Sequence, residues 1–251
     1  MRRGAGSAIV ASVAMLVAAC GSGGRGELTV SAATSLRDAF TAYGRTFGAA
    51  DVRFSFAGSD QLAAQIRSGA RPDVFAAADT SLPQALFAAG LLERPVQFAS
   101  NRLVIAVPAG GSKVRGLTDL GRRGVAVATG TRSVPVGSYA AQVLDRLPAS
   151  LRRRILANVR SSEPDVAGIV GKLTQGAADA GFVYLTDVRA AAGRLRAIRL
   201  PARLAPRVAY AAGVVRGSGR RAAAVRFVRG LVSGAGRRRL RAAGFGPPPG
   251  Q

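Results

Sequence analysis

Apolar positions along the chain follow two spacings, and these alternate from one segment to the next. Short apolar or alternating runs between Gly, Pro and polar residues predict strands, whereas apolar residues at every third or fourth position predict helices. Strands are expected at 27–32, 51–56, 73–77, 102–107, 124–128, 180–184 and 208–215. Helices are expected from residue 35, from residue 59, and at 82–89, 138–147, 165–176, 219–230 and 236–243. Strands that alternate with helices in this way predict parallel α/β sheets covered on both faces.

The length of 251 residues is more than one such sheet needs. Two strand segments flanked by proline, 102–108 and 206–215, are predicted to carry the chain between two lobes. Ligands of open α/β sheets bind beyond the carboxyl ends of the strands, where the following helices begin. The loops between strands and helices are therefore where a binding site is expected.

The composition restricts the chemistry that the chain can perform. It contains no His and one Cys, which excludes a His-dependent triad, a structural zinc site and a disulfide framework. A nucleophile at Ser35 or Ser59 would need Lys113 or Lys172 as its base, and neither lysine lies in a motif with a serine. We therefore expect no enzymatic activity, no catalytic residue, no metal cation site and no cofactor.

Basic residues outnumber acidic ones by 36 to 13, which gives a formal net charge of +23. Such an excess is typical of proteins that bind nucleic acid or an anionic surface. The arginine runs at 152–154 and 237–239 lack interleaved aromatic residues on which bases stack. We interpret them as solvent-facing helix surfaces and expect no nucleic-acid partner. Among the few carboxylates, Asp73 and Asp79 are interpreted as structural because no suitable titratable partner lies near them in the sequence.

The first residues have the pattern of a secretory signal, with two arginines, an apolar stretch and small residues ahead of Cys20. The sequence VAAC at 17–20 resembles a bacterial lipobox, in which the Cys is lipidated and becomes the mature N-terminus. Residues 1–19 are thus predicted to be a lipoprotein signal peptide, Cys20 the lipid attachment site and 20–26 a flexible tether. The alternative is an ordinary signal with an incidental Cys. Both place the mature chain outside the cytoplasm, and the lipoprotein is also anchored to the membrane.

Polar residues follow three of the predicted strands, where the next helix begins. Ser35 precedes Asp38 in a variant of the capping box, Ser59 follows FSFAG, and the segment 132–138 reads RSVPVGS. Helix N-termini present unpaired N–H groups and a partial positive charge, so they bind oxyanions. Converging helix starts with added hydroxyls can hold a dianion without a charged side chain. The alternative is that both serines only cap their helices.

Seven segments, in order along the chain, resemble the periplasmic molybdate-binding proteins of ABC transporters. They are SAATSLRDAF, FSFAGSDQLAAQI, PDVFAAAD, SNRLVIAVP, SVPVGSYA, GFVYLTDV and the terminal AAGFG. The resemblance implies a type II periplasmic-binding-protein fold: two α/β lobes, each a mostly parallel sheet flanked by helices, with the ligand in the cleft between them. It places lobe 1 at 27–105 and 209–246, lobe 2 at 106–208 and a tail at 247–251.

The resemblance also implies which positions contact the oxyanion. They are three side-chain hydroxyls and two backbone N–H groups: Ser35, Ser59 and Tyr184, then Val136 and Val166. In this family no Lys or Arg contacts the anion. This sequence departs from the family at Arg132, which brings positive charge to the third loop, and at Leu185 and Thr186, which replace smaller residues.

The expected function is the capture of molybdate or tungstate by a monomeric lipoprotein that delivers it to the permease of an ABC importer. One alternative keeps the fold and binds another oxyanion, such as sulfate. Phosphate is disfavoured because its proton needs an acceptor, and none of the five positions supplies one. A second alternative is a non-transport cell-surface protein that binds polyanions through its charge, with a steep dependence on salt.

Overall fold

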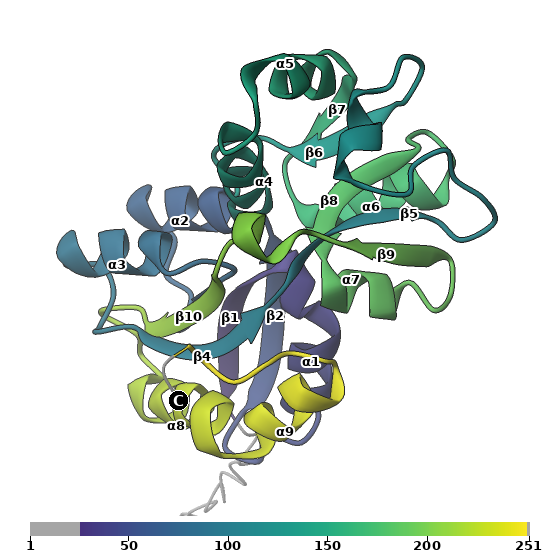
Figure 1. Ribbon diagram of the computed structural model, residues 1–251. Coiled ribbons are helices and arrows are strands. Elements are labelled where there is room, and N and C mark those ends of the chain that lie inside the picture. The colour runs from purple at the N-terminus through teal and green to yellow at the C-terminus, as the bar shows by residue number, and fades with distance from the viewer. Residues whose placement is uncertain (1–25, 250–251) are drawn as a thin grey trace, which may run out of the picture.

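The computed structural model describes residues 26–249 and arranges them as two lobes, each built on a five-stranded sheet (Figure 1). The first sheet has the order β2 (Asp51–Ala57), β1 (Glu27–Ala33), β3 (Val74–Ala77), β10 (Val208–Val214) and β4 (Val96–Asn101). The second has the order β7 (Val159–Glu163), β6 (Val127–Gly130), β8 (Ala180–Tyr184), β5 (Leu103–Pro108) and β9 (Leu195–Arg199). The predicted signal peptide and Cys20 lie outside the described residues.

Nine α-helices and three short 3-10 helices surround these sheets within residues 26–249. The α-helices are α1 (Arg37–Gly44), α2 (Ser59–Arg67), α3 (Ser81–Ala88), α4 (Pro135–Asp145), α5 (Ala149–Ala157), α6 (Val166–Thr174), α7 (Leu185–Ala190), α8 (Arg221–Ser233) and α9 (Ala235–Ala242). The 3-10 helices are η1 (Thr34–Leu36), η2 (Leu117–Gly121) and η3 (Ala202–Leu204). The two-lobe α/β architecture is therefore as the sequence predicts.

The two sheets share one plan, in which a single strand opposes the other four. In the first sheet β1 pairs in parallel with β2 and β3, while β10 pairs antiparallel with both β3 and β4. In the second, β6 pairs in parallel with β7 and β8, while β5 pairs antiparallel with β8 and β9. Each sheet is thus mixed, although most of its strands run in one direction.

The chain passes between the lobes twice. It first crosses at Arg102, between β4 of the first sheet and β5 of the second, and it returns through residues 200–207, between β9 and β10. The sequence analysis expected the segments 102–108 and 206–215 to cross. Only their first residues do so, because 103–108 form β5 within the second sheet and 208–214 form β10 within the first. The boundary that the sequence analysis placed between residues 105 and 106 falls inside β5.

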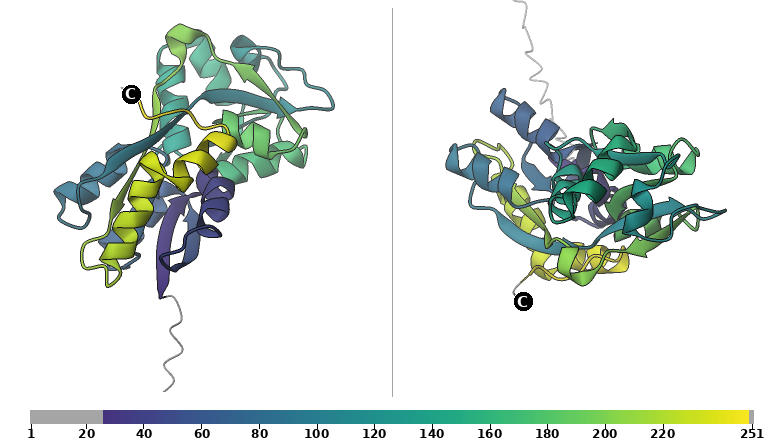
Figure 2. Two further views of the ribbon diagram at one scale, coloured as in Figure 1. Left: turned by 90° about the horizontal axis from the view of Figure 1, so that it is seen from below. Right: turned by 45° about the horizontal axis from the view of Figure 1, so that its top comes forward.

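Apolar side chains cover both faces of the first sheet. Along β3, Val74 and Ala76 face one side and Phe75 the other, as successive residues of a strand must. The first side is covered by α1, α8 and α9, and the second by α2 and α3 (Figure 2). On the α1 side, the rings of Phe40 and Phe227 meet edge to face with centroids 5.6 Å apart. This burial fixes the strand ends from which the site is built.

Asp73 has a structural role in the first lobe, as its interpretation from the sequence expects. Its carboxylate accepts hydrogen bonds from the N–H and the hydroxyl of Thr29, at 2.7 and 3.0 Å. It also accepts one from the Ser218 hydroxyl at 2.6 Å. Asp79 likewise accepts from the hydroxyl of Ser81 at the start of α3.

Candidate functional site

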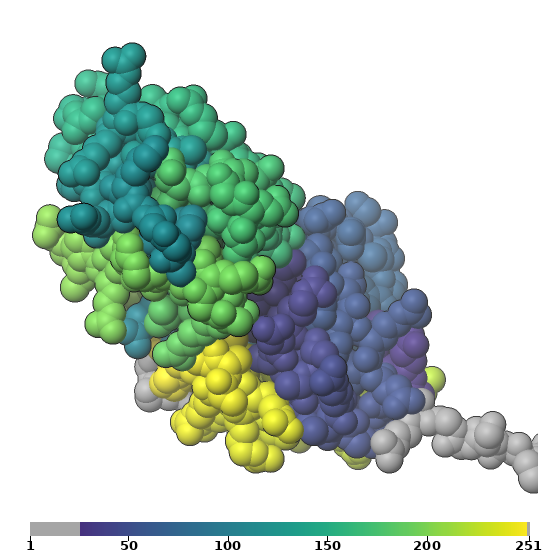
Figure 3. Space-filling view, turned by 90° about the vertical axis from the view of Figure 1, so that its right-hand side faces the viewer, coloured from purple at the N-terminus to yellow at the C-terminus, as the bar shows by residue number. Residues whose placement is uncertain are grey.

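One small cavity lies between the lobes, where the ends of three parallel strands of the first sheet meet the ends of three parallel strands of the second. Its volume is about 20 Å³. It is lined by residues at or just after the ends of β1, β2, β3, β6, β7 and β8: Ala33, Thr34, Ser35, Ala57, Gly58, Ser59, Ala78, Val134, Pro135, Val136, Asp165, Val166 and Tyr184. All five positions that the sequence analysis named for the oxyanion are in this set. The space-filling view shows the second lobe lying directly against the first (Figure 3).

Ser59 is the first residue of α2, and Gly58 is its N-cap. The expectation that Ser59 caps this helix is therefore wrong, because Ser59 lies inside the helix, one residue after the cap. The hydroxyl oxygen instead accepts a hydrogen bond from the Ala78 N–H at 3.1 Å, in a buried position. A hydroxyl that accepts through its oxygen keeps its proton free to donate. Ser59 can therefore offer that proton to a ligand in the cavity.

Ser35 does not cap a helix either. It lies in the middle of η1, whose N-cap is Ala33, and α1 begins only at Arg37. Its hydroxyl lies 3.0 Å from that of Tyr210 on β10. The proposed pairing with Asp38 in a capping box is thus absent, and the hydroxyl is held by a residue 175 positions away.

Tyr184 ends β8 with its ring almost fully buried. Its hydroxyl is buried and has no hydrogen-bond partner among the described residues. Burial raises the pKa of Tyr184 well above its ordinary value, so the group stays protonated and can donate. The ring meets those of Tyr139 and Tyr210 edge-on, with centroids 6.4 and 5.9 Å away. The hydroxyl that completes the predicted ligand set is therefore fixed in place and unused.

Val136 and Val166 lie in the first turns of α4 and α6. The helix predicted from residue 138 begins earlier, at Pro135, because a fixed φ and a missing N–H suit proline to the first helical position. N–H groups of a first helical turn have no acceptor within their own helix, and they carry a partial positive charge. Both backbone groups are therefore suited to an anion.

The electrostatics of the cavity depend on helix ends rather than on basic side chains. Among the residues of 26–249 that line it, none is Lys or Arg. Arg132, which the sequence analysis placed near the anion, does not line it; its guanidinium is exposed and lies 3.8 Å from the Asp145 carboxylate. Any anion held here is held by neutral donors and helix dipoles.

Asp165 is a lining residue that the sequence analysis missed. It is the N-cap of α6, and its Oδ1 accepts from the Gly168 N–H at 3.0 Å. The sequence signal was the EPDV motif, in which Asp precedes the apolar run of a helix. Its carboxylate is the acceptor that a protonated phosphate would need. The argument from the sequence against phosphate considered only the five named positions, and Asp165 adds a carboxylate-bearing residue to the lining.

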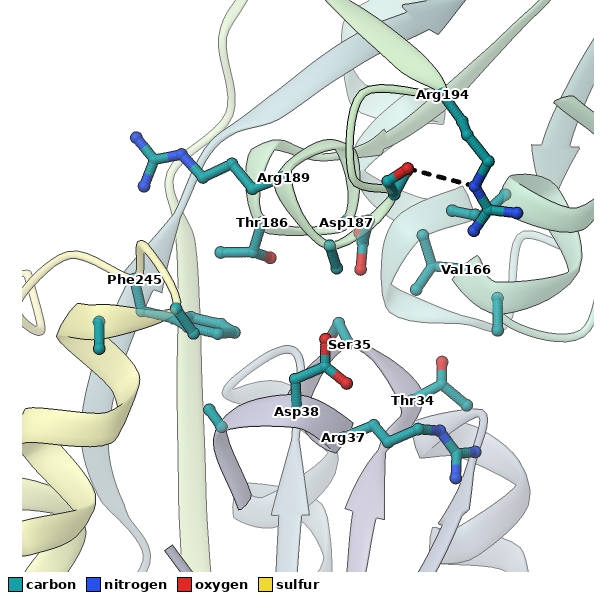
Figure 4. A pocket seen from close by; sticks show the side chains of 17 residues that line it. Thr34, Ser35, Arg37, Asp38, Val166, Thr186, Asp187, Arg189, Arg194 and Phe245 are labelled. Carbon is teal, nitrogen blue, oxygen red and sulfur yellow. Dashed lines mark hydrogen bonds between the residues drawn. The ribbon is translucent and has the colours of Figure 1, made fainter. Parts of the chain in front are cut away.

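A larger cavity of about 470 Å³ borders the small one and shares Thr34, Ser35 and Val166 with it (Figure 4). The carboxylates of Asp38 from the first lobe and Asp187 from the second point into it. Asp187 also accepts the N–H of Tyr184 at 2.9 Å. Burial raises the pKa of Asp187 to about 7.

A chain of hydrogen bonds joins the small cavity to the point where the chain changes lobe. The Tyr210 hydroxyl that holds Ser35 also lies 3.4 Å from Nδ2 of Asn101, the last residue of β4. Nδ2 of Asn101 donates to the hydroxyl of Thr186 in the second lobe at 2.8 Å. Thr186, one of the departures from the family, thus contacts the first crossing and not the small cavity.

The two sheets and the shared cavity define a two-lobe solute-binding protein. Residues 28–246 match the family model described as "Bacterial extracellular solute-binding protein", and the chain belongs to this family. It is similar to the molybdate-binding protein ModA of Mycobacterium tuberculosis, with 39% identity over 222 residues that cover 80% of each chain. The family is one of binding proteins rather than enzymes, and its members act outside the cytoplasm.

Solved structures agree with this assignment. The periplasmic molybdate-binding protein of Azotobacter vinelandii superposes with a TM-score of 0.78 at 24% identity, over 88% of this chain and 99% of that one. The substrate binding domain of a putative molybdenum ABC transporter from Clostridium difficile gives a TM-score of 0.65 at 27% identity, over 88% and 98%. Between residues 26 and 249, no helix is long and apolar enough to cross a membrane.

Proposed function

We propose that this protein captures molybdate or tungstate outside the cytoplasm and delivers it to an ABC importer. The observation that carries the proposal is the set of donors at the small cavity: the hydroxyls of Ser35, Ser59 and Tyr184, and the first-turn N–H groups of α4 and α6. A fully deprotonated tetrahedral dianion offers only acceptors, so it matches a site made mostly of donors. The names of the similar proteins support the same ligand class.

Selection among oxyanions rests on two features of this cavity. Sulfate has the shape and charge of molybdate, so only its smaller size distinguishes it. Phosphate differs in carrying a proton near neutral pH, and Asp165 gives that proton an acceptor. Sulfate and phosphate are therefore the competing ligands to test, and a polyanion-binding surface function is the remaining alternative.

The export and anchoring of the chain are also part of the proposal. Removal of residues 1–19 and lipidation of Cys20 would leave the folded part on a short tether, 20–26, at the membrane surface. This position keeps the carrier close to its permease. The protein acts as a monomer, without a cofactor and without nucleic acid. Its arginine-rich exterior raises the local concentration of dianions and attracts the protein to anionic surfaces.

Thermal unfolding of the soluble mature form, with Cys20 replaced, tests the ligand. A ligand present at 100 times its Kd stabilises the folded state by about 2.7 kcal/mol. For a chain of this size that raises the melting temperature by roughly 5–10 °C. We expect this rise with molybdate and tungstate and a much smaller one with sulfate and phosphate at equal concentration, because both of the latter are smaller tetrahedral anions.

Salt separates capture in the cavity from binding by surface charge. The stabilisation by molybdate is expected to persist in high salt, because buried interactions are screened little. Polyanion binding at the surface falls steeply with salt. An unchanged melting temperature with both molybdate and tungstate, in protein shown to be folded and free of ligand, contradicts the proposal.

A further inference from the structure

The backbones of the two lobes come very close at one point of the cavity wall. Gly58 is the N-cap of α2 in the first lobe, and Pro164 immediately precedes Asp165, the N-cap of α6 in the second. A Cβ atom added to Gly58 would lie 2.4 Å from the carbonyl oxygen of Pro164. Side chains do not tolerate such a distance, so only glycine allows this approach.

The local conformation of Gly58 does not itself require glycine. Its φ of −58° and ψ of 137° lie in a region open to every L-residue. The second atom near the added Cβ is Oδ1 of Asp60, at 2.9 Å, which belongs to the same helix and can rotate away. Glycine is therefore needed at this position to make room for the second lobe. The fold of the first lobe does not require it.

We propose that the contact between Gly58 and the Pro164 carbonyl is the spacer that sets the width of the anion cavity, and with it the choice among tetrahedral oxyanions. This inference rests on the proposed function. Ala57, Gly58 and Ser59 line one side of the cavity, and Asp165 and Val166 line the other. The contact thus joins the two helix starts whose donors would face the anion.

The displacement that a side chain would force is large for so small a cavity. To bring the added Cβ from 2.4 Å to an ordinary contact of 3.4 Å, the two helix starts must separate by about an ångström. Mo–O bonds are longer than S–O bonds by less than this displacement. The cavity volume is about 20 Å³, so a gap of this size breaks the fit for every small oxyanion and removes the discrimination between them.

Two substitutions at this position separate the spacing from helix capping. Gly58→Ala adds the obstructing Cβ but weakens the cap, whereas Gly58→Ser adds the same atom and is a favourable N-cap. The matched control is Gly116→Ala, because Gly116 is the N-cap of η2 and no atom lies within 4 Å of an added Cβ there. Each variant is compared with the wild type by calorimetric titration with molybdate, tungstate and sulfate. Melting without ligand and small-angle scattering with and without ligand complete the comparison.

Both Gly58 variants are expected to bind molybdate at least tenfold more weakly than the wild type and to lose most of the preference for molybdate over sulfate. They are also expected to contract less on ligand addition. Gly116→Ala should match the wild type throughout, and Gly58→Ser should melt at or above Gly58→Ala without ligand.

Three results overturn the inference. The first is wild-type affinity and preference in both Gly58 variants. The second is a loss of affinity accompanied by a large fall in the ligand-free melting temperature of Gly58→Ser, which indicates a folding defect. The third is that the wild type itself binds no oxyanion. This result contradicts the proposed function as well as the inference, whereas the first two contradict the inference alone.

Discussion

The hydroxyls of Ser35 and Tyr210 lie 3.0 Å apart, so one of the proposed anion donors is held by β10, the first strand after the chain returns from the second lobe. Tyr210 is buried, and its ring also meets that of Tyr184 edge-on. Tyr210 thus contacts two of the three side chains assigned to the anion: Ser35 through its hydroxyl and Tyr184 through its ring. Tyr210 does not line the cavity, which makes it a positioning residue.

Tyr210→Phe tests this role. Removal of the phenolic oxygen frees the Ser35 hydroxyl to rotate, and an intramolecular hydrogen bond contributes about 0.5–1.5 kcal/mol. We expect molybdate affinity to fall roughly 2- to 12-fold in calorimetric titration. Tyr43→Phe is the control, because Tyr43 also donates from a buried hydroxyl, to the Phe227 carbonyl, but lies away from the cavity. Equal affinities in the two variants would contradict the positioning role.

Tyr184→Phe should change stability and affinity in opposite directions. The buried Tyr184 hydroxyl has no partner among the described residues, and leaving such a group unsatisfied costs about 1–3 kcal/mol. Its removal is therefore expected to raise the ligand-free melting temperature. Molybdate binding should weaken about tenfold or more, since a hydrogen bond to a charged group contributes about 1.5–3 kcal/mol. A variant that is less stable and binds normally would show that the hydroxyl has a different role.

Ser59→Ala should lower both the stability of the ligand-free protein and its affinity for molybdate. The Ser59 oxygen is the acceptor for the N–H of Ala78, and both residues are buried. Alanine leaves this N–H unsatisfied, so we expect the free energy of unfolding without ligand to fall by about 1–3 kcal/mol. Molybdate affinity should also fall about tenfold. Denaturant titration and calorimetry measure the two effects, with Ser233→Ala at the exposed last residue of α8 as the control. Unchanged stability would indicate that the bond to Ala78 is absent in solution.

Asp187 makes the stability of the ligand-free protein depend on pH. Its pKa is raised by burial to about 7, from an ordinary value of about 3.9. The folded state therefore binds more protons than the unfolded state between about pH 4 and pH 7, and the free energy of unfolding falls as pH rises through that window. Above pH 7 this contribution is constant.

Asp187→Asn removes this titration and keeps an oxygen to accept the Tyr184 N–H. We expect the variant to melt above the wild type at pH 8, and the difference to shrink as the pH approaches 4.5. Scanning calorimetry without ligand over this range measures it. A difference that stays constant with pH would show that Asp187 is charged in the folded protein throughout.

The central strands of both sheets could be predicted from the sequence because they are apolar on both faces. β3 and β8 are buried at every residue, and each reads as a continuous apolar run. The strands that the sequence analysis missed, β4, β7 and β9, all lie at sheet edges. Edge strands keep one side in water and carry polar residues there; β7 reads VRSSE and β9 reads LRAIR. Their patterns resemble loops until a neighbouring strand is known.

The candidate site, too, could be predicted only in part from the sequence. Ser35 and Ser59 were found because serine beside a predicted helix start is a local signal. Their partners come from other elements: Tyr210 from β10, 175 positions away, and Ala78 from the loop after β3, 19 positions away. Hydrogen bonds across such separations depend on the tertiary fold and leave no trace in local spacing. For the same reason the sequence offered no sign that Gly58 meets a carbonyl of the other lobe.

The donors around the small cavity are divided between the lobes: Ser35 and Ser59 belong to the first, and Val136, Val166 and Tyr184 to the second. In the proposed site, neither lobe alone supplies all five contacts to the anion. If a transporter moves the lobes apart by little more than the length of a hydrogen bond, the anion loses either the two contacts of the first lobe or the three of the second. We therefore expect separation of the lobes to weaken binding without a competing ligand in the cavity.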